Sequence, residues 1–154
     1  MAIIIRCTLA LGLAFVLLQF VQVRHLSMAR TAPKQPVPVQ SAGDPEVSAI
    51  LGRSCIDCHS SHTVVPWYGR VAPISWILSS HVNRGRQKLD FSAWDSRRPL
   101  RGEKQDICDA VSDGSMPLRS YILIHRYAKL TNHDTDAICN WADAQSVSQV
   151  APAR

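Results

Sequence analysis

The stretch Cys55-Ile56-Asp57-Cys58-His59 constrains this chain more than any other, because two cysteines and a histidine at this spacing can share one ligand. In a CxxCH pattern each thiol can add to one vinyl group of the same porphyrin, and the imidazole that follows can reach the iron from one face. We therefore predict that Cys55 and Cys58 tether a haem covalently and that His59 is its first axial ligand. The expected cofactor is one haem c with its iron.

Two other uses of a CxxC pair lack their usual context here. A structural zinc site would need a second paired cluster, whereas Cys108 and Cys139 stand apart in the sequence. A thioredoxin-like redox pair would lie in a βαβ unit, and the sequence shows no alternation of strands and helices.

The remaining cysteines of the domain leave two possibilities open. Export would permit a disulfide between Cys108 and Cys139, which would contribute about 3 to 4 kcal/mol in the chain-entropy model. The alternative is two small buried thiols, because the sequence does not show whether their Cβ atoms face each other.

The N-terminus is predicted to be an export segment. An apolar run from Cys7 to Val23 follows Arg6, and its seventeen residues lie between a signal-peptide core and a comfortable membrane span. Cleavage after Ala29 would release a soluble periplasmic protein, and the bases that follow the run oppose an anchor with its N-terminus inside. The length of the run favours an uncleaved anchor in the bacterial inner membrane. The chain then divides into a signal peptide or membrane anchor (1–23), a proline-rich linker (24–43), a c-type haem-binding domain (44–145) and a disordered tail (146–154).

The segment after the linker predicts an all-α fold, a small cytochrome c-like helical domain around one covalent haem. Asp44 and Pro45 supply a cap and a first-turn proline for a helix that should run to about Arg53. Other helices are expected over 103–112 and from a capping box at 131–134, the last packing on the first. Because so short a domain buries little apolar surface, the haem should form part of its core.

One more helix is expected to begin at Pro73 and to end before Gly85, since glycine is favoured just beyond a helix end. Its apolar residues recur at helical spacing and should point inward. They are Ile74, Ile77, Leu78, His81 and Val82.

The occupant of the second face of the iron largely decides what such a protein does. Met116, next to Pro117, is the preferred sixth ligand because it is the domain's only methionine, although methionine more often fills gaps. His81 is the alternative, with a core histidine bonded to a carbonyl or propionate as its ordinary explanation. His125 has a weaker context, and His62 lies too near His59 to cross the haem.

Further short stretches are more specific together than CxxCH alone. They are Pro66-Trp67-Tyr68, Ala72-Pro73-Ile74-Ser75-Trp76, His81-Val82 with Gly85-Arg86, Asp90-Phe91-Ser92-Ala93-Trp94, Gly114-Ser115-Met116-Pro117-Leu118 with Tyr121 and His125, and Leu130-Thr131 with Trp141-Ala142. With these the chain resembles the small bacterial haem-binding-domain proteins of c-type cytochrome character. The resemblance implies an anchored or exported, mostly helical haem domain. Its helix order is similar to class I cytochrome c, from which it departs at His62, Val65 and Arg84.

Seven bases and three acids lie between Arg84 and Lys104, in a chain of net charge +5. Such a patch could neutralise haem propionates, bind an acidic redox partner, contact anionic lipid or be an ordinary solvated surface. Export makes nucleic acid an unsuitable partner.

The expected function is that of a single-haem electron carrier, a c-type cytochrome on the periplasmic side of the membrane, and not an enzyme. The alternative is a haem-based sensor, or a haem protein reactive toward small ligands or peroxide, with an open sixth position. Peroxidase-like activity would need a distal acid–base group, for which His81 or His125 could serve.

Overall fold

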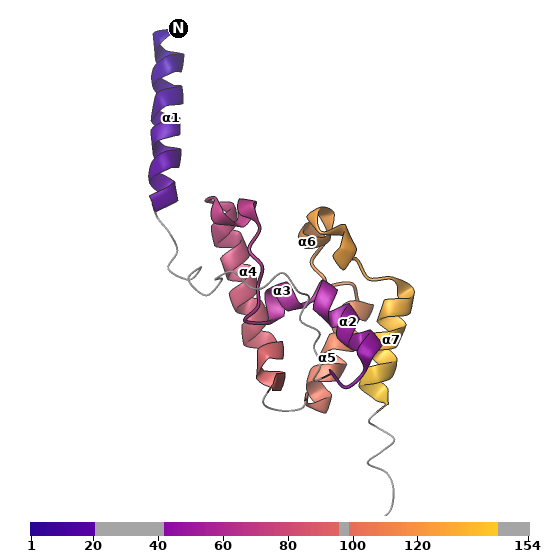
Figure 1. The fold of residues 1–154 in the computed structure, drawn as a ribbon. Coiled ribbons are helices and arrows are strands. Elements are labelled where there is room, and N and C mark those ends of the chain that lie inside the picture. The colour runs from indigo at the N-terminus through magenta and orange to yellow at the C-terminus, as the bar shows by residue number, and fades with distance from the viewer. Residues whose placement is uncertain (21–41, 96–98, 145–154) are drawn as a thin grey trace, which may run out of the picture.

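The computed structural model describes residues 1–20, 42–95 and 99–144, and within these ranges every regular element is a helix (Figure 1). The predicted all-α class is therefore confirmed. Most of the expected linker, the cleavage site after Ala29 and the expected tail lie outside the described residues.

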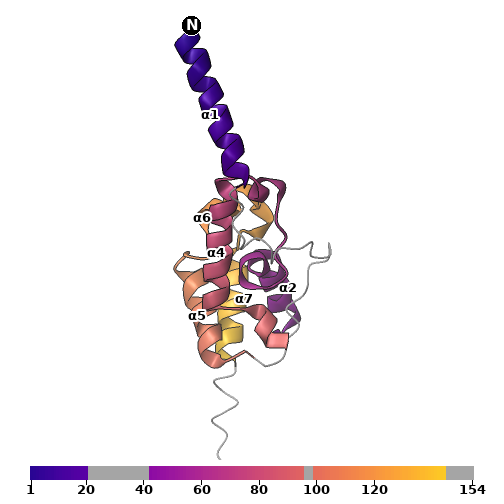
Figure 2. The ribbon, with the colours of Figure 1, turned by 90° about the vertical axis from the view of Figure 1, so that its left-hand side faces the viewer.

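Helix α1 (Ala2–Phe20) projects from one end of the domain (Figures 1 and 2). It is long and apolar enough to cross a membrane, with a mean hydropathy of 2.1 over its first 18 residues and none of them buried in the protein. It begins before the predicted start at Cys7, because the isoleucines ahead of Arg6 continue the apolar helix. The backbone N–H of Ala72 donates to Oε1 of Gln19 at 3.0 Å, which joins the end of α1 to the domain.

Helix α2 (Pro45–Ser54) forms as the sequence predicts. The Asp44 carboxylate accepts hydrogen bonds from the N–H groups of Glu46 and Val47 at 2.9 and 3.0 Å, and so satisfies donors that a helix start leaves free. The helix buries Val47 and Leu51 against the core. It delivers the chain directly to the CxxCH motif.

Helix α3 (Ile56–His59) carries most of the motif, and α4 (Ile74–Lys88) packs against it. The predicted end of α4 before Gly85 is wrong, since the helix runs one turn further. A Cβ built at Gly85 would lie 2.7 Å from the carbonyl oxygen of Cys58, so this glycine lets two backbones approach closely inside the helix rather than ending it.

The predicted buried face of α4 is also wrong in part. Its buried residues are Ser75, Ser79 and Val82, whereas Ile74 and Ile77 are 46% and 56% exposed. Small side chains occupy the inner face because α4 lies close to its neighbours, and the larger isoleucines are left outside.

Helices α5 (Arg101–Ser112) and α7 (Asn132–Asp143) pack together and form the main wall of the core. The predicted capping box opens α7, with Asp134 and Thr131 bonded reciprocally. Cys108 and Cys139 form a disulfide between the two helices, which resolves the alternatives left open by the sequence. Helix α7 packs on α2, as expected, as well as on α5.

Several short elements had no clear signal in the sequence. They are η3 (Trp67–Arg70), η4 (Phe91–Asp95), α6 (Arg119–Ile124) and η5 (Arg126–Ala128). Elements of one or two turns are too short to show a hydrophobic periodicity, because recognising a helical pattern needs a window of about 11 residues. Two of them, η4 and α6, contribute a residue each, Phe91 and Tyr121, to the walls of the pockets described below.

Candidate cofactor pocket

His59 stands at the end of α3 with its ring already oriented. Its Nδ1 lies 3.0 Å from the carbonyl oxygen of Leu89, and because a carbonyl can only accept, Nδ1 carries the proton. The lone pair of Nε2 is then left for a metal. Burial lowers the pKa of His59, against hydrogen bonds to Leu89 and Gly85 that raise it, so the imidazole favours its neutral, ligating form.

Of the two motif cysteines, Cys55 lies just before α3 and Cys58 lies within it. Cys55 ends α2 and begins α3, donating its N–H to the carbonyl of Leu51 at 2.9 Å. Burial raises the pKa of Cys55 to about 12 and that of Cys58 to about 11, so both thiols stay protonated. The described residues contain no group of three or more side chains suited to hold a metal ion by themselves.

Two adjoining pockets, of about 460 and 310 Å³, open beside the motif. The larger one extends along α5, and the smaller one along α4 and the start of α6. Each volume lies in the range of about 300–1,000 Å³ that is typical of cofactor sites. Both pockets are lined by Cys55, His59, Lys88 and Met116. One flat cofactor could therefore occupy both, with its centre near His59 and Met116.

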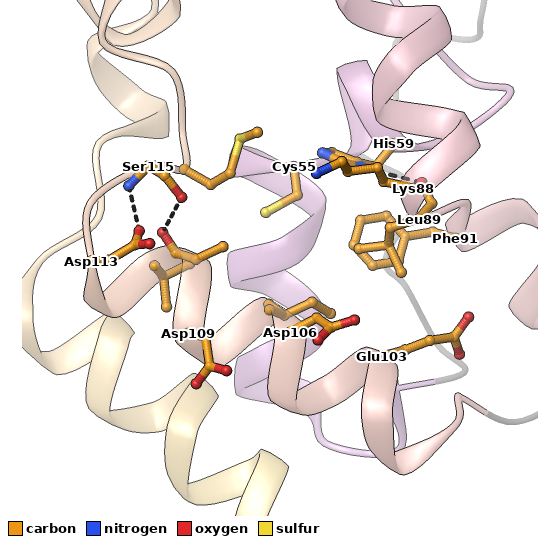
Figure 3. Close-up of a pocket in the computed structure, with 14 residues that line it drawn as sticks. Cys55, His59, Lys88, Leu89, Phe91, Glu103, Asp106, Asp109, Asp113 and Ser115 are labelled. Atoms are coloured by element: carbon orange, nitrogen blue, oxygen red, sulfur yellow. Dashed lines mark hydrogen bonds between the residues drawn. The ribbon is translucent and has the colours of Figure 1, made fainter.

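Met116 lies in the loop between α5 and α6, and this loop is held in place from α5. The N–H of Met116 donates to the carbonyl of Ala110 at 3.0 Å, and the hydroxyl of Ser115 donates to the same oxygen at 3.2 Å. The carboxylate of Asp113 receives the N–H of Ser115 at 2.7 Å. In Figure 3, Ser115 and Asp113 lie across the pocket from His59. Met116 therefore comes from the side that faces the histidine.

His81 also lines the smaller pocket, together with Cys58 and Gly85. It lies one turn before Gly85 on α4, the helix whose backbone rests on Cys58. The pocket thus brings both candidates for the sixth ligand near the motif, from different walls. Met116 and His81 remain predictions as ligands.

The other histidines are arranged differently. His125 uses both ring nitrogens, Nε2 with the hydroxyl of Tyr68 at 2.6 Å and Nδ1 with the hydroxyl of Tyr127 at 3.0 Å. Its ring stacks on Tyr121 with the centroids 4.4 Å apart. His62 lines neither pocket.

Tyr121 and Asp57 form a link that the motif alone does not predict. The Tyr121 hydroxyl donates to Oδ2 of Asp57 at 2.7 Å and so ties α6 to α3 beside the smaller pocket. Burial and the carboxylate both raise the pKa of Tyr121 above its usual range. Leu89 was also missed, because its contribution is a backbone carbonyl that no side-chain pattern reports.

Among the residues that the structure describes, the bases of the expected patch have different surroundings. Arg84 and Lys88 line the pockets, where cations could meet propionates. Arg86 instead donates to the Ser60 carbonyl at 2.6 Å and the Thr63 hydroxyl at 2.8 Å, and Lys104 is buried with Nζ 4.1 Å from the Trp141 ring centre. Arg97 and Arg98 lie outside the described residues.

One wall of the larger pocket is negatively charged. This wall is formed by α5 and the loop after it. Four carboxylates line this side, and only Lys88 opposes them among the bases that line the pocket. They are Glu103, Asp106, Asp109 and Asp113. The bases that line the two pockets, Arg84 and Lys88, therefore lie on the side of α4. A negatively charged group of a ligand would be favoured on this side.

Comparison with known proteins gives one match. The model of a family described as a haem-binding domain matches residues 13–144, which include the end of α1 and the whole pocket. Neither the curated proteins nor the solved structures give a significant match.

Proposed function

The chain belongs to the haem-binding domain family, and from this premise we propose that it is a membrane-anchored c-type cytochrome that carries single electrons. The observation that carries the proposal is the orientation of His59, whose Nδ1 is engaged by Leu89 so that Nε2 is available to iron. His59 also lines both pockets, so the nitrogen that the Leu89 bond does not use belongs to a residue of the cofactor wall.

The residues around the pocket fit a covalently held haem. Cys55 and Cys58 line it as neutral thiols and would form thioethers to the two vinyl groups. Phe91 packs near the His59 ring, with the ring centroids 6.1 Å apart, and would limit water on that side. When bound, haem would supply a one-electron couple, and the chain would set its potential through ligand choice and burial.

We propose Met116 as the sixth ligand. The two axial ligands of a haem must approach from opposite faces, and the loop of Met116 faces His59 across the pocket. His81 instead stands on α4, which flanks the motif on the side of Cys58. Two hydrogen bonds from the loop to Ala110 of α5, and one within the loop between Ser115 and Asp113, would hold the thioether without further ordering.

The proposed location is the periplasmic side of the inner membrane. Helix α1 would remain as an uncleaved anchor, because it is a continuous apolar helix of spanning length and the family match begins inside it. The proposed haem attachment at CxxCH would require an exported domain, and the pocket would then lie outside the cytoplasm. A redox protein is the proposed partner, and no chemical transformation of a substrate is assigned to the pocket.

Visible spectroscopy of the full-length protein tests this function. The oxidised protein should be low-spin and show the weak long-wavelength band of a methionine sulfur bound to ferric haem, and the reduced protein should refuse carbon monoxide. Met116→Ala should remove the band and admit carbon monoxide, whereas His81→Ala should change neither.

A different spectrum would point to the second candidate. His81 lines the pocket and could serve as a distal group, so a high-spin iron that binds carbon monoxide would support a sensor or a peroxide-reactive haem protein. If the unchanged protein is low-spin without the sulfur band, and His81→Ala is no longer low-spin, then His81 is the ligand. Either result would overturn the assignment of Met116.

A further inference from the structure

The end of the domain next to α1 exposes several large apolar side chains. Trp67 in η3 is 79% exposed, and Ile74 at the start of α4 is 46% exposed. Leu123 and Ile124 at the end of α6 are 77% and 63% exposed. We call these four residues the apical patch. Exposed apolar residues that gather on one face of a soluble domain commonly mark a binding surface.

Hydrogen bonds hold the elements of the apical patch together beneath α1. The hydroxyl of Tyr68 in η3 bonds to His125 at the end of α6, and Ala72, just before α4, donates to Gln19 of α1. Figures 1 and 2 show α1 ending close to the start of α4, and α6 at this same end of the domain. The patch and the exit of α1 therefore share one end of the molecule.

The length of α1 indicates where a bilayer would end. Its apolar window of 18 residues closes at Gln19, and at 1.5 Å a residue it would span about 27 Å, close to the hydrocarbon thickness of about 30 Å. The boundary between lipid and water would then fall near Gln19. Because Ala72 contacts Gln19, the apical patch lies at the same level as this boundary.

The charges around the patch suit an anionic surface. Neither residues 58–89 nor residues 114–133 contain an acid, although the chain has 12 Asp and Glu residues in all. Exposed bases occur in η3 and α6 of the patch and at the neighbouring η5, namely Arg70, Arg119, Arg126 and Lys129. Bases beside exposed tryptophan and aliphatic residues are characteristic of surfaces that enter the headgroup region of a membrane.

We propose that the apical patch lies on the lipid bilayer that α1 enters, with its apolar side chains among the headgroups and the nearby bases on anionic lipid. The proposal rests on the retention of α1 as an anchor. The haem domain is then held on the membrane in one orientation instead of moving freely on a tether. Its pocket would meet partners that lie in, or move along, the same membrane.

Nitroxide labels on the full-length holoprotein in lipid nanodiscs test this docking. Single cysteines replace Trp67 or Leu123 in a Cys7→Ala background, with Gln105→Cys on the exposed side of α5 as the matched control. Intact mass verifies one label per chain and the presence of α1. In bilayers that contain phosphatidylglycerol, labels 67 and 123 should collide several-fold more with oxygen than with a water-soluble nickel complex, and label 105 should show the reverse.

Each outcome separates docking from anchoring. If the protein stays on the membrane but labels 67 and 123 are as accessible to nickel as label 105, docking is overturned and the anchor is not. The patch would then bind a protein partner instead of lipid. Recovery of a soluble chain without α1 would overturn both docking and the proposed anchor. Leu123→Glu with Ile124→Glu should raise nickel access at label 67 several-fold, whereas Asp136→Glu should not.

Discussion

The backbone of Gly85 rests on the carbonyl of Cys58, at a distance where a Cβ would approach the oxygen to 2.7 Å. The contact joins α4 to α3 and places His81, Lys88 and the carbonyl of Leu89 around the pocket. A glycine in a helix interior usually costs stability, so its presence here is explained by the close approach.

Gly85→Ala should therefore separate the two helices and weaken haem binding. Overpacking of this kind costs about 1–3 kcal/mol, measured as a fall in thermal stability and in haem occupancy. Gly102→Ala is the matched control, because a Cβ at Gly102 would meet nothing within 4 Å. It should be neutral, or stabilising by up to about 1 kcal/mol, since alanine is the better helix former. Equal effects of the two variants would contradict the role assigned to Gly85.

Cys55→Ala and Cys58→Ala should each weaken covalent attachment of haem, and the double variant should abolish it. The reason is that each thiol is expected to supply one thioether from the same wall of the pocket. Haem staining after denaturing electrophoresis measures attachment, with Cys7→Ala in α1 as the control that should retain full staining. Haem that survives denaturation in the double variant would refute the c-type assignment.

Asp134 should make stability depend on pH in the acid range. Burial alone would raise its pKa, but hydrogen bonds from Arg53 and Thr131 outweigh that effect and hold the pKa at about 2. A folded pKa below the usual value of 3.8 means that the carboxylate stabilises the fold above about pH 4. This contribution, about 2 kcal/mol, is lost as the pH falls from 4 through about 2.

Asp134→Asn should consequently destabilise the protein by about 2 kcal/mol at pH 7, and the difference from the unchanged chain should shrink below pH 4. Urea unfolding followed by circular dichroism at pH 7 and pH 3 measures both values. Asp136→Asn, at an exposed position of the same helix, is the control. A difference that stays constant from pH 7 to pH 3 would show that the ion pair with Arg53 does not carry the effect.

The Cys108–Cys139 disulfide should contribute about 3–4 kcal/mol, because it closes a loop across 31 residues and limits the unfolded chain. Replacing both cysteines with alanine should lower the unfolding midpoint while the haem spectrum stays unchanged, since neither residue lines the pockets. A reducing agent should shift the unchanged protein in the same direction. If a reducing agent does not change the unfolding midpoint of the unchanged protein, the Cys108–Cys139 disulfide does not stabilise it.

Tyr121→Phe should loosen α6, because Oδ2 of Asp57 would lose the hydroxyl that now donates to it at 2.7 Å. The expected cost is about 1–3 kcal/mol, as for other hydrogen bonds to charged groups. A double-mutant cycle with Asp57→Ala isolates the pair from other contacts of either residue. A coupling energy near zero would mean that α6 is held by packing alone.

Local sequence rules predicted the helices that have strong ends. Asp44 and Pro45 start α2, and Thr131 with Asp134 starts α7, because a capping side chain needs only its own next few residues. The same rules failed at Gly85, where glycine signals a helix end only if no other backbone requires the space. Lys104 is a similar case, since the sequence suggests a surface base and the fold buries it on Trp141.

The sequence by itself determined the all-α class, the apolar N-terminal helix and the haem family, because caps, hydropathy and CxxCH are written in neighbouring residues. Only the tertiary structure decided which nitrogen of His59 is available, because the partner is a carbonyl 30 residues away. It likewise paired Cys108 with Cys139 and brought the loop of Met116 opposite the motif. These relationships join residues distant along the chain, and no local pattern specifies how two helices pack.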